Sequence, residues 1–321
     1  MANAISLPRR FPPTGDQCFK TRYRLRISCM WPYILFMQRL HALFRVSSIH
    51  TRHCQYFLVL AIGAMFYPGV QAASNSVYLD DLTWTEVHSA LQKGSTTVII
   101  PVGGTEQSGP HMALGKHNDR VHVLAGRIAE KMGNALVAPV VSYVPEGQIS
   151  PPTGHMKFAG TISIPDDAFL AVLKGAARSL KQHGFLNIVF IGDHGGYQHL
   201  LRTEAQQLNQ EWWGSKTRAH FISAYYRAAT EDFVQTLESA GIPKDQIGVH
   251  AGLADTSLAM AVDPTLVRVE KLKGASSGGT VTTGVAGNPA GSTAELGRIG
   301  VEKIVEKCVQ SIRDSIALRP K

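Results

Sequence analysis

The amino-acid sequence predicts an α/β protein with one mostly parallel central sheet that helices cover on both faces. Short β-branched and apolar runs alternate with helical patterns from Leu79 onward. The run Ile-Val-Phe-Ile at residues 188–191 is apolar at every position, which is typical of a strand buried on both faces. Parallel strands need long crossover connections, and the helical patterns between the runs can provide them.

Four strands and seven helices are expected from these patterns. The strands are runs rich in β-branched and aromatic residues, at 96–102, 136–143, 187–192 and 220–225. The helices have apolar residues at helical spacing, at 83–92, 118–132, 166–184, 198–213, 229–240, 253–262 and 291–316. One long loop, rich in Gly, Ser and Thr, is expected at 274–291.

Composition indicates a globular protein and argues against a nucleic-acid partner. The chain has 321 residues, of which 44% are hydrophobic and 17% charged. Its formal charge of +8 is concentrated in residues 1–72, which hold nine Lys or Arg and one Asp. The remaining 249 residues carry 23 groups of each sign, so they offer no basic surface for a polyanion.

Residues 1–72 are expected to be an N-terminal extension that contains a signal peptide. An apolar run of 12 residues at 56–67 follows three arginines and precedes small residues, which is the order of a secretory signal. The run is shorter than the roughly 20 residues of a membrane-spanning helix. We expect translation to start at Met37 and cleavage to follow Ala72, which leaves residues 73–321 as one domain. An uncleaved anchor and a buried N-terminal helix are the competing interpretations.

Export, with the bacterial periplasm as the destination, follows from this interpretation, and no stable membrane span is expected after cleavage. Three of the four cysteines lie in the part that would be removed, and only Cys308 would remain. No disulfide within the chain is then possible, so the fold must depend on its core. Cys308 is expected to be a small buried apolar group on the C-terminal helix.

Imidazoles and carboxylates gather where predicted strands end. Ligands bind at the carboxyl ends of the strands in parallel sheets, so these side chains are expected to meet there. They are Glu106, His111, His117, Asp119, Asp193, His194, His250 and Asp255. Nitrogen and oxygen ligands without thiolates suit a catalytic Zn, Mn or Fe ion. Such an ion lowers the pKa of water and polarises a carbonyl group, which are two requirements of amide hydrolysis.

Competing interpretations of these motifs are weaker. A lone loop histidine is more often a hydrogen-bonded or surface residue than a ligand, and only the joint occurrence in three loops favours a site. The glycine-rich segment 103–109 lacks the Gly-Lys-Ser/Thr ending and the GxGxxG spacing of phosphate loops. The sequence contains no GxSxG motif and no motif around Cys308, which argues against a Ser or Cys nucleophile.

Five segments, in order along the chain, resemble the motifs of the creatininase family of metal-dependent amidohydrolases. They are Ile99–His111, Gly154–Ser163, Ile191–Gly196, His250–Ser257 and Gly284–Pro289. The resemblance implies a three-layer α/β/α fold, one or two divalent ions and hydrolysis of an amide C–N bond. It also implies a homo-oligomer, usually a hexamer.

By this resemblance the metal ligands are expected to be Glu106, His117, His194 and Asp255. Two departures from the family pattern bear on the metal. Ser108 stands where the family has a histidine ligand, and His117 stands where it has an aspartate that can bridge two ions. We therefore expect one Zn, Mn or Fe ion per chain.

The remaining site residues are also assigned through the resemblance. Glu106 and His250 are expected to act in catalysis, with His250 carrying the proton to the leaving nitrogen. Contacts to the substrate are expected from His111, His155 and Ser108, although loop-stabilising hydrogen bonds explain the first two equally well. Asp193 and Asp119 are expected to contact the ligand side chains and not the metal itself. Asp193 is expected either to orient the ring of His194 or to cap a helix.

The expected substrate is a small-molecule amide, and two further interpretations stay open. The same scaffold could remove a formyl group or cleave a small peptide precursor. A second class is an exported binding protein that kept the fold and lost catalysis, because a fold does not fix a function. Metal content distinguishes this class from an enzyme.

Overall fold

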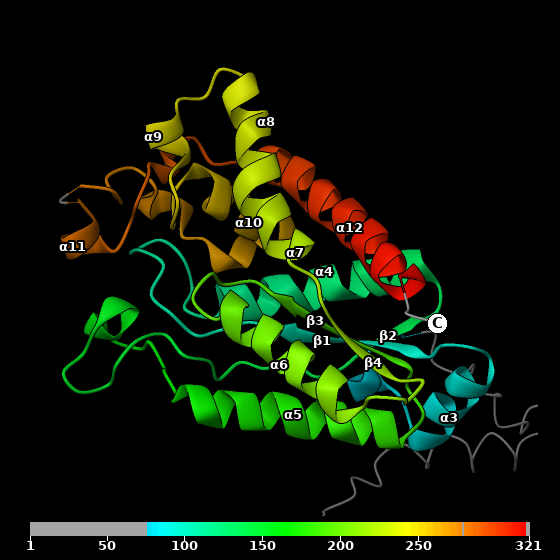
Figure 1. Ribbon diagram of the computed structural model, residues 1–321. Coiled ribbons are helices and arrows are strands. Elements are labelled where there is room, and N and C mark those ends of the chain that lie inside the picture. The colour runs from blue at the N-terminus through cyan, green and yellow to red at the C-terminus, as the bar shows by residue number, and fades with distance from the viewer. Residues whose placement is uncertain (1–75, 278, 319–321) are drawn as a thin grey trace, which may run out of the picture. The chain divides into compact units, whose positions relative to one another are not determined.

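The structure is a computed structural model that describes residues 76–277 and 279–318 (Figure 1). The chain divides into two units, Met1–Gln71 and Ala72–Lys321, and all described residues belong to the second. The expected signal peptide, the start at Met37 and the cleavage after Ala72 lie outside the described residues and stay predictions. Within residues 76–277 and 279–318, no helix has both the length and the apolarity to cross a bilayer.

A four-stranded parallel sheet forms the centre, as the apolar runs predict. Its order is β2-β1-β3-β4. The strands are β1 (Thr97–Val102), β2 (Ala135–Val137), β3 (Asn187–Gly192) and β4 (Arg218–Phe221). β1 pairs with β3 along its whole length, from Thr97 opposite Asn187 to Val102 opposite Gly192. All strands are parallel, so their carboxyl ends meet at one edge of the sheet.

Two strands are shorter than predicted. β2 ends at Val137 because Pro139 has no N–H for the ladder, although the backbone pairs once more where Val141 lies opposite Val102. β4 ends at Phe221, and α7 (Ala224–Arg227) begins where the prediction continued the strand. Aromatic residues favour strands locally, but Tyr225 packs into the core from a helical turn instead.

One face of the sheet is covered by α4 (Lys116–Met132), α10 (Leu253–Val262) and α12 (Ala294–Ala317) (Figure 1). Their apolar side chains form one core with the inward side chains of β1 and β3. The side chain of Thr293 caps α12 by accepting a hydrogen bond from the Leu296 N–H. Cys308 is fully buried on α12, as predicted, and burial raises the pKa of its thiol.

The other face is covered by α3 (Trp84–Gln92), α5 (Asp166–Gln182) and α6 (Gln198–Glu211) (Figure 1). A capping box between Thr83 and Glu86 starts α3. A second core forms on this side of the sheet. The expected three-layer α/β/α architecture with a parallel sheet is confirmed.

Shorter elements complete the described chain. The α-helical ones are α8 (Phe233–Ser239), α9 (Lys244–Ile247) and α11 (Gly279–Thr283). A π-helical segment, η3 (Ala228–Asp232), joins α7 to α8. The 3-10 turns are η1 (Leu79–Asp81), η2 (Gly154–Lys157), η4 (Pro264–Leu266), η5 (Val269–Lys271) and η6 (Pro289–Gly291). The expected loop at 274–291 thus contains α11 and η6.

Two helices of the first layer touch through a glycine. A Cβ atom on Gly297 of α12 would collide with the backbone oxygen of Ser257 in α10. Close helix packing at this point therefore requires a residue without a side chain. The contact places the start of α10, which carries Asp255, against the long C-terminal helix.

We expect Gly297→Ala to destabilise the fold by about 1–3 kcal/mol, since the added methyl forces α10 and α12 apart. Gly175→Ala is the matched control, because Gly175 is exposed in α5 and a Cβ there meets nothing within 4 Å. The control is expected to gain up to about 1 kcal/mol from helix propensity. Urea unfolding measures both changes, and equal midpoints for Gly297→Ala and wild type would contradict the close contact.

Candidate functional site

Polar side chains from four elements converge at the carboxyl edge of the sheet. Glu106 follows β1, His194 follows β3, and His117 lies in the first turn of α4. Asp255 lies in the first turn of α10. Strand ends and helix starts thus face one another, which is the arrangement expected for ligand sites in parallel α/β folds.

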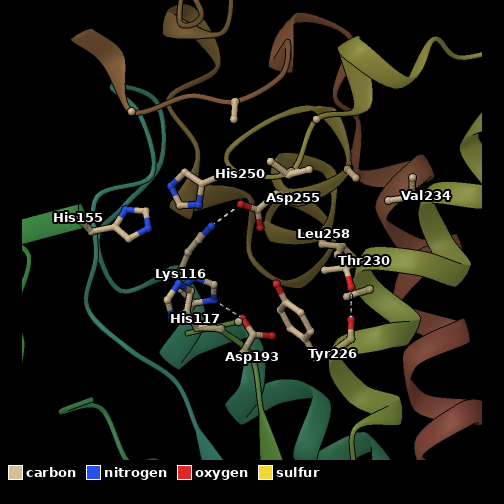
Figure 2. Close-up of a pocket in the computed structure, with 18 of the residues that line it drawn as sticks. Lys116, His117, His155, Asp193, Tyr226, Thr230, Val234, His250, Asp255 and Leu258 are labelled. Carbon is tan, nitrogen blue, oxygen red and sulfur yellow. Dashed lines mark hydrogen bonds and ion pairs between the residues drawn. The ribbon is translucent and has the colours of Figure 1, made fainter. Parts of the chain in front are cut away.

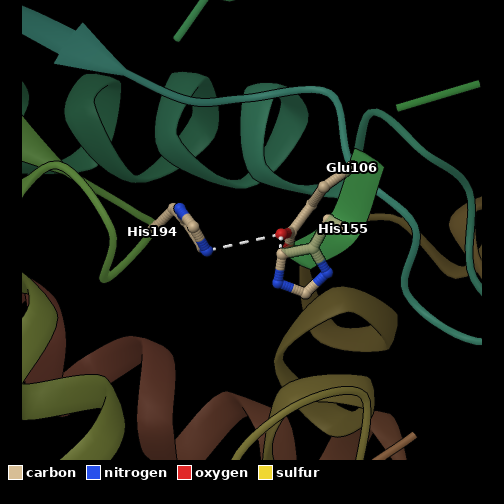
Figure 3. Close-up of side chains that lie close together, drawn as sticks. All are labelled: Glu106, His155 and His194. Carbon is tan, nitrogen blue, oxygen red and sulfur yellow. Dashed lines mark ion pairs between the residues drawn. The ribbon is translucent and has the colours of Figure 1, made fainter. Parts of the chain in front are cut away.

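The Glu106 carboxylate is the centre of the cluster and is fully buried. Its Oε2 lies 3.2 Å from Nε2 of His155 and 3.3 Å from Nε2 of His194 (Figure 3). Ligand atoms of these three residues lie within 4.8 Å of one another, so they could hold a metal ion. Oε2 has no hydrogen-bond partner within the described part of the chain. An orphaned buried carboxylate oxygen fits a cation site.

Charge at this centre is set by competing effects. Burial alone would raise the pKa of Glu106, but the neighbouring His117 and Lys116 lower it below its usual range. Burial lowers the pKa of His194 to about 3. Glu106 is therefore ionised at neutral pH, and the ring of His194 is neutral, as metal ligands must be.

His117 bridges two carboxylates. Its Nε2 lies 2.6 Å from Oε1 of Glu106, and its Nδ1 lies 2.5 Å from Oδ2 of Asp193. Burial and Lys116 oppose protonation, yet the two carboxylates raise the pKa of His117 above its usual value. The carboxylates at both ring nitrogens favour the protonated form of His117, whose charge offsets the buried charge of Glu106.

Asp193 lies against His117 and not, as expected, against the ring of the neighbouring His194. Its carboxylate also accepts hydrogen bonds from Nε of Arg120 at 2.9 Å and from the hydroxyl of Tyr225 at 2.7 Å. Burial alone would raise the pKa of Asp193, but Arg120 and His117 hold it below its usual range. Asp119 is exposed on α4, where burial and Asp263 raise its pKa, and it takes no part in this network.

Asp255 is paired with two cations, Lys116 and Arg120. Figure 2 shows the pair with Lys116. The Lys116 ammonium is fully buried between Asp255 and Glu106 and lies 3.9 Å from Oε1 of Glu106. The Ala251 N–H also donates to Asp255, at 2.9 Å. The expected ligand Asp255 thus belongs to an ion-pair network with Lys116 and Arg120, and Lys116 connects this network to Glu106. Lys116 and Arg120 escaped the sequence analysis, although they share one helical turn with His117.

Two groups of Gln107 lie beside Nε2 of His250. The backbone oxygen, at 3.0 Å, can only accept a hydrogen bond, and the side-chain Nε2, at 3.1 Å, can only donate one. When Nε2 of His250 donates to the backbone oxygen, its Nδ1 has a free lone pair and lies 3.7 Å from Oε1 of Glu106. Burial lowers the pKa of His250 to about 4, so the ring is neutral and can accept a proton at Nδ1.

The hydrogen bonds of the Gln107 amide determine which nitrogen of His155 carries the proton. The Gly109 N–H donates to Oε1 of Gln107 at 3.0 Å, and Nε2 of Gln107 donates to the Gly284 carbonyl at 3.3 Å. The amide orientation is therefore fixed, and Nε2 of Gln107 donates to Nδ1 of His155 at 2.9 Å. His155 consequently carries its proton at Nε2, which lies 3.2 Å from Oε2 of Glu106 without forming a hydrogen bond to it.

Glu146 is a buried carboxyl group that the sequence analysis did not single out. Its Oε2 lies 3.3 Å from Nδ1 of His194, and burial together with Glu106 raises its pKa to about 9. A Cβ atom on Gly104 would lie 2.6 Å from Oε1 of Glu146, so the glycine makes room for the carboxyl group. No motif marks Glu146, and only the fold brings it to the cluster.

Two expected substrate contacts are buried in the protein. Nε2 of His111 lies 3.0 Å from the hydroxyl of Thr256, which favours a loop-stabilising role. Ser108 is fully buried and its hydroxyl has no partner among residues 76–277 and 279–318. His155, the third expected contact, lines the adjoining cavity.

The cavity beside the cluster has a volume of about 880 Å³. His155, His194 and His250 line its polar end. At the other end its walls include Val234, from α8, and Leu258, from α10 (Figure 2). The π-helical segment Ala228–Asp232 contributes to this wall, and such segments are frequent at functional sites.

Fold and cluster together define an α/β protein with a carboxylate and imidazole site at the carboxyl edge of a parallel sheet. The creatininase family profile, described as creatinine amidohydrolase, matches residues 80–312. This match covers most of the chain, and the protein belongs to the creatininase family. The resemblance seen in the five sequence motifs is confirmed.

Relatives match this chain over most of their own length. A mycofactocin precursor peptide peptidase of Mycobacterium ulcerans is 29% identical over 71% of this chain and 89% of the relative. A creatinine amidohydrolase of Pseudomonas putida is 26% identical over 76% of this chain and 97% of the relative.

Solved structures agree in fold. A crystal structure of creatininase matches with a TM-score of 0.63 at 23% identity, over 77% of this chain and all of that protein. A manganese form of creatininase matches with a TM-score of 0.62 at 22% identity, over 75% of this chain and 99% of that protein.

We expect Lys116→Met to destabilise the metal-free protein by about 3–5 kcal/mol, because it removes one partner of a buried ion-pair network. Lys131→Met is the matched control, since Lys131 and Glu306 form a 3.5 Å pair with side chains 51% and 68% exposed. The control is expected to change stability by less than about 1 kcal/mol. Urea unfolding at pH 7 measures both, and equal losses would contradict the assigned network.

Proposed function

We propose that this protein is a metal-dependent amidohydrolase that cleaves a C–N amide bond with one divalent ion per chain. The observation that carries the proposal is the ionised, fully buried Glu106, whose Oε2 faces imidazole nitrogens and has no hydrogen-bond donor within the described residues. Membership of a family with amidohydrolase members supports it.

Glu106, His117 and His194 are the proposed ligands. His194 is neutral, and His117 would release its proton when an ion binds, as ligand imidazoles do. The donor set of nitrogen and oxygen atoms fits Zn, Mn or Fe. Asp255, which the sequence analysis included, stays with Lys116 and Arg120 in this proposal. The bound ion would supply Lewis-acid activation of water and of the amide carbonyl.

The chain itself provides the proton-handling groups. His250 accepts a proton at Nδ1, the nitrogen that faces the cluster, and returns it to the leaving nitrogen. His155 presents an N–H that can hydrogen-bond to a substrate oxygen and so orient the amide. His117 and Lys116 place positive charge beside Glu106, which holds Glu106 ionised in the metal-free protein.

Cleavage of a small peptide precursor is the second candidate, and the size of the cavity favours it. A cavity of about 880 Å³ is large for a small cyclic amide and lies in the range of about 300–1,000 Å³ that suits larger ligands. The mycobacterial relative is a peptidase acting on a precursor peptide by its name.

No distance or contact within residues 76–277 and 279–318 specifically favours removal of a formyl group or a purely binding role. The orphaned oxygen of Glu106 instead favours a bound cation. A homo-oligomer, with a hexamer as the expected size, is part of the proposal.

We expect elemental analysis of the purified protein to find about one Zn, Mn or Fe per chain, in line with a three-ligand catalytic site. The double variant Glu106→Ala/His194→Ala is expected to lose this metal, whereas Asp119→Ala, at an exposed position, retains it. Two equivalents in wild type would contradict a single ion. No metal after reconstitution would favour a binding protein.

We expect His250→Ala to lower kcat/KM toward an amide or peptide substrate by about 100-fold or more, because the proton carrier is lost. Its metal content is expected to stay at the wild-type value. His199→Ala serves as the matched control, since His199 is exposed on α6. If His250→Ala loses its metal as well, His250 belongs to the ligand set instead.

A further inference from the structure

The side chain of Tyr226 lines the cavity beside the cluster, and its hydroxyl group is free to bind a ligand. Tyr226 lies in α7, and Figure 2 shows its ring among the side chains of the cavity wall. The backbone oxygen of Tyr226 accepts a hydrogen bond from the Thr230 hydroxyl at 2.9 Å, but the Tyr226 hydroxyl makes no hydrogen bond within residues 76–277 and 279–318. A polar group that faces a cavity without a protein partner is available to a bound molecule.

Neighbouring contacts fix the position of this hydroxyl. Tyr225, the preceding residue of α7, is fully buried and donates its own hydroxyl to Asp193 at 2.7 Å. A Cβ atom on Gly195 would lie 2.5 Å from the hydroxyl oxygen of Tyr226, so the glycine leaves the space that this oxygen needs. The hydroxyl therefore lies against the loop that carries His194, at the polar end of the cavity.

Aliphatic side chains line the cavity on the other side of Tyr226. Val234, from α8, and Leu258, from α10, lie there (Figure 2). The charged residues that line this side are all exposed, and they are Glu231, Glu238 and Lys244. An aliphatic group of a ligand that packs against Val234 and Leu258 would leave water, which favours binding. Tyr226 thus lies between a hydrogen-bonding end and an aliphatic wall.

We propose that the Tyr226 hydroxyl binds the substrate by donating a hydrogen bond to a carbonyl oxygen of an amide that carries an aliphatic group. The aliphatic group packs against Val234 and Leu258. A tyrosine hydroxyl is a neutral donor, which suits an uncharged carbonyl oxygen. The inference rests on the proposed amidohydrolase function and deepens it, because it names one substrate contact and the class of amide that fits the cavity.

The test uses N-acetyl-L-leucinamide as the probe, because it has two carbonyl oxygens and an aliphatic side chain. Wild type and Tyr226→Phe are labelled with ¹³C at Cζ of tyrosine, and the signal that the variant lacks belongs to Tyr226. We expect this signal to shift in wild type as the probe binds. Tyr226→Phe is expected to bind the probe about 3–10-fold more weakly, which is the effect of losing one hydrogen bond. Where the probe is cleaved, KM takes the place of Kd.

Tyr143→Phe is the matched control for the hydroxyl. Tyr143 is 61% exposed and does not line the cavity, so this variant is expected to bind the probe like wild type. Urea unfolding tests for a structural role of Tyr226. We expect Tyr226→Phe to unfold at the wild-type midpoint, because the hydroxyl has no partner among the described residues. A lower midpoint with unchanged affinity would identify a structural role and overturn the inference.

A second probe, N-acetylglycinamide, tests the aliphatic wall because it lacks the side chain. We expect wild type to prefer the leucine probe about 10-fold or more. Val234→Thr replaces one methyl group of the wall by a hydroxyl and is expected to reduce this preference about 3-fold or more. Val172→Thr, at a half-exposed position of α5, is the matched control. Equal affinity of wild type for both probes, or an unchanged preference in Val234→Thr, would contradict the assigned wall.

Three outcomes overturn the role of the hydroxyl: no binding of N-acetyl-L-leucinamide to wild type, equal affinity of wild type and Tyr226→Phe, or a Tyr226 signal that does not shift at saturation. Failure of the proposed function is distinguishable from these. If wild type holds no metal, the metal-dependent function fails, while binding of the probe still decides the role of Tyr226. Cleavage of the probe with equal KM in wild type and Tyr226→Phe contradicts the inference alone.

Discussion

The buried negative charge of Glu106 is the constraint on which the rest of the site depends. A fully enclosed carboxylate is costly unless charges and hydrogen-bond donors surround it. Here the surrounding groups come from α4, from the loop after β3 and from the 3-10 turn η2. The loops at the carboxyl edge of the sheet must therefore stay close together. Side chains of the same loops line one end of the adjoining cavity, which is why that end is polar.

Helix α4 connects this centre to the rest of the fold. Within its first turns, Lys116, His117 and Arg120 place three cationic groups against the carboxylates of Glu106, Asp193 and Asp255. The three acids come from segments that are far apart in sequence. Because each cation contacts more than one acid, the network ties β1, β3 and α10 together, and α10 is held in turn by its close packing against α12.

Local sequence signals predicted much of the fold and part of the site. Continuous apolar runs identified β1 and β3. Pro139 makes β2 shorter than predicted. The last residues predicted for β4 lie in α7 instead, from which Tyr225 packs into the core. Glu106 and His194 were recognisable because they follow predicted strands at the edge where ligands bind in parallel sheets. Lys116, Arg120 and Glu146 were not, since a charged residue at a helix start or in a loop looks like any solvated group until the fold buries it.

The sequence by itself determined the layered α/β architecture, the family and the chemical types of the side chains at the carboxyl edge of the sheet, because these follow from periodicity, strand order and motif. Only the tertiary structure decided which carboxylate faces which nitrogen. Asp255 lies with Lys116 and Arg120, and Glu146 lies at His194. Such pairings depend on distances of a few ångströms between segments that are far apart along the chain, which no local pattern in the sequence encodes.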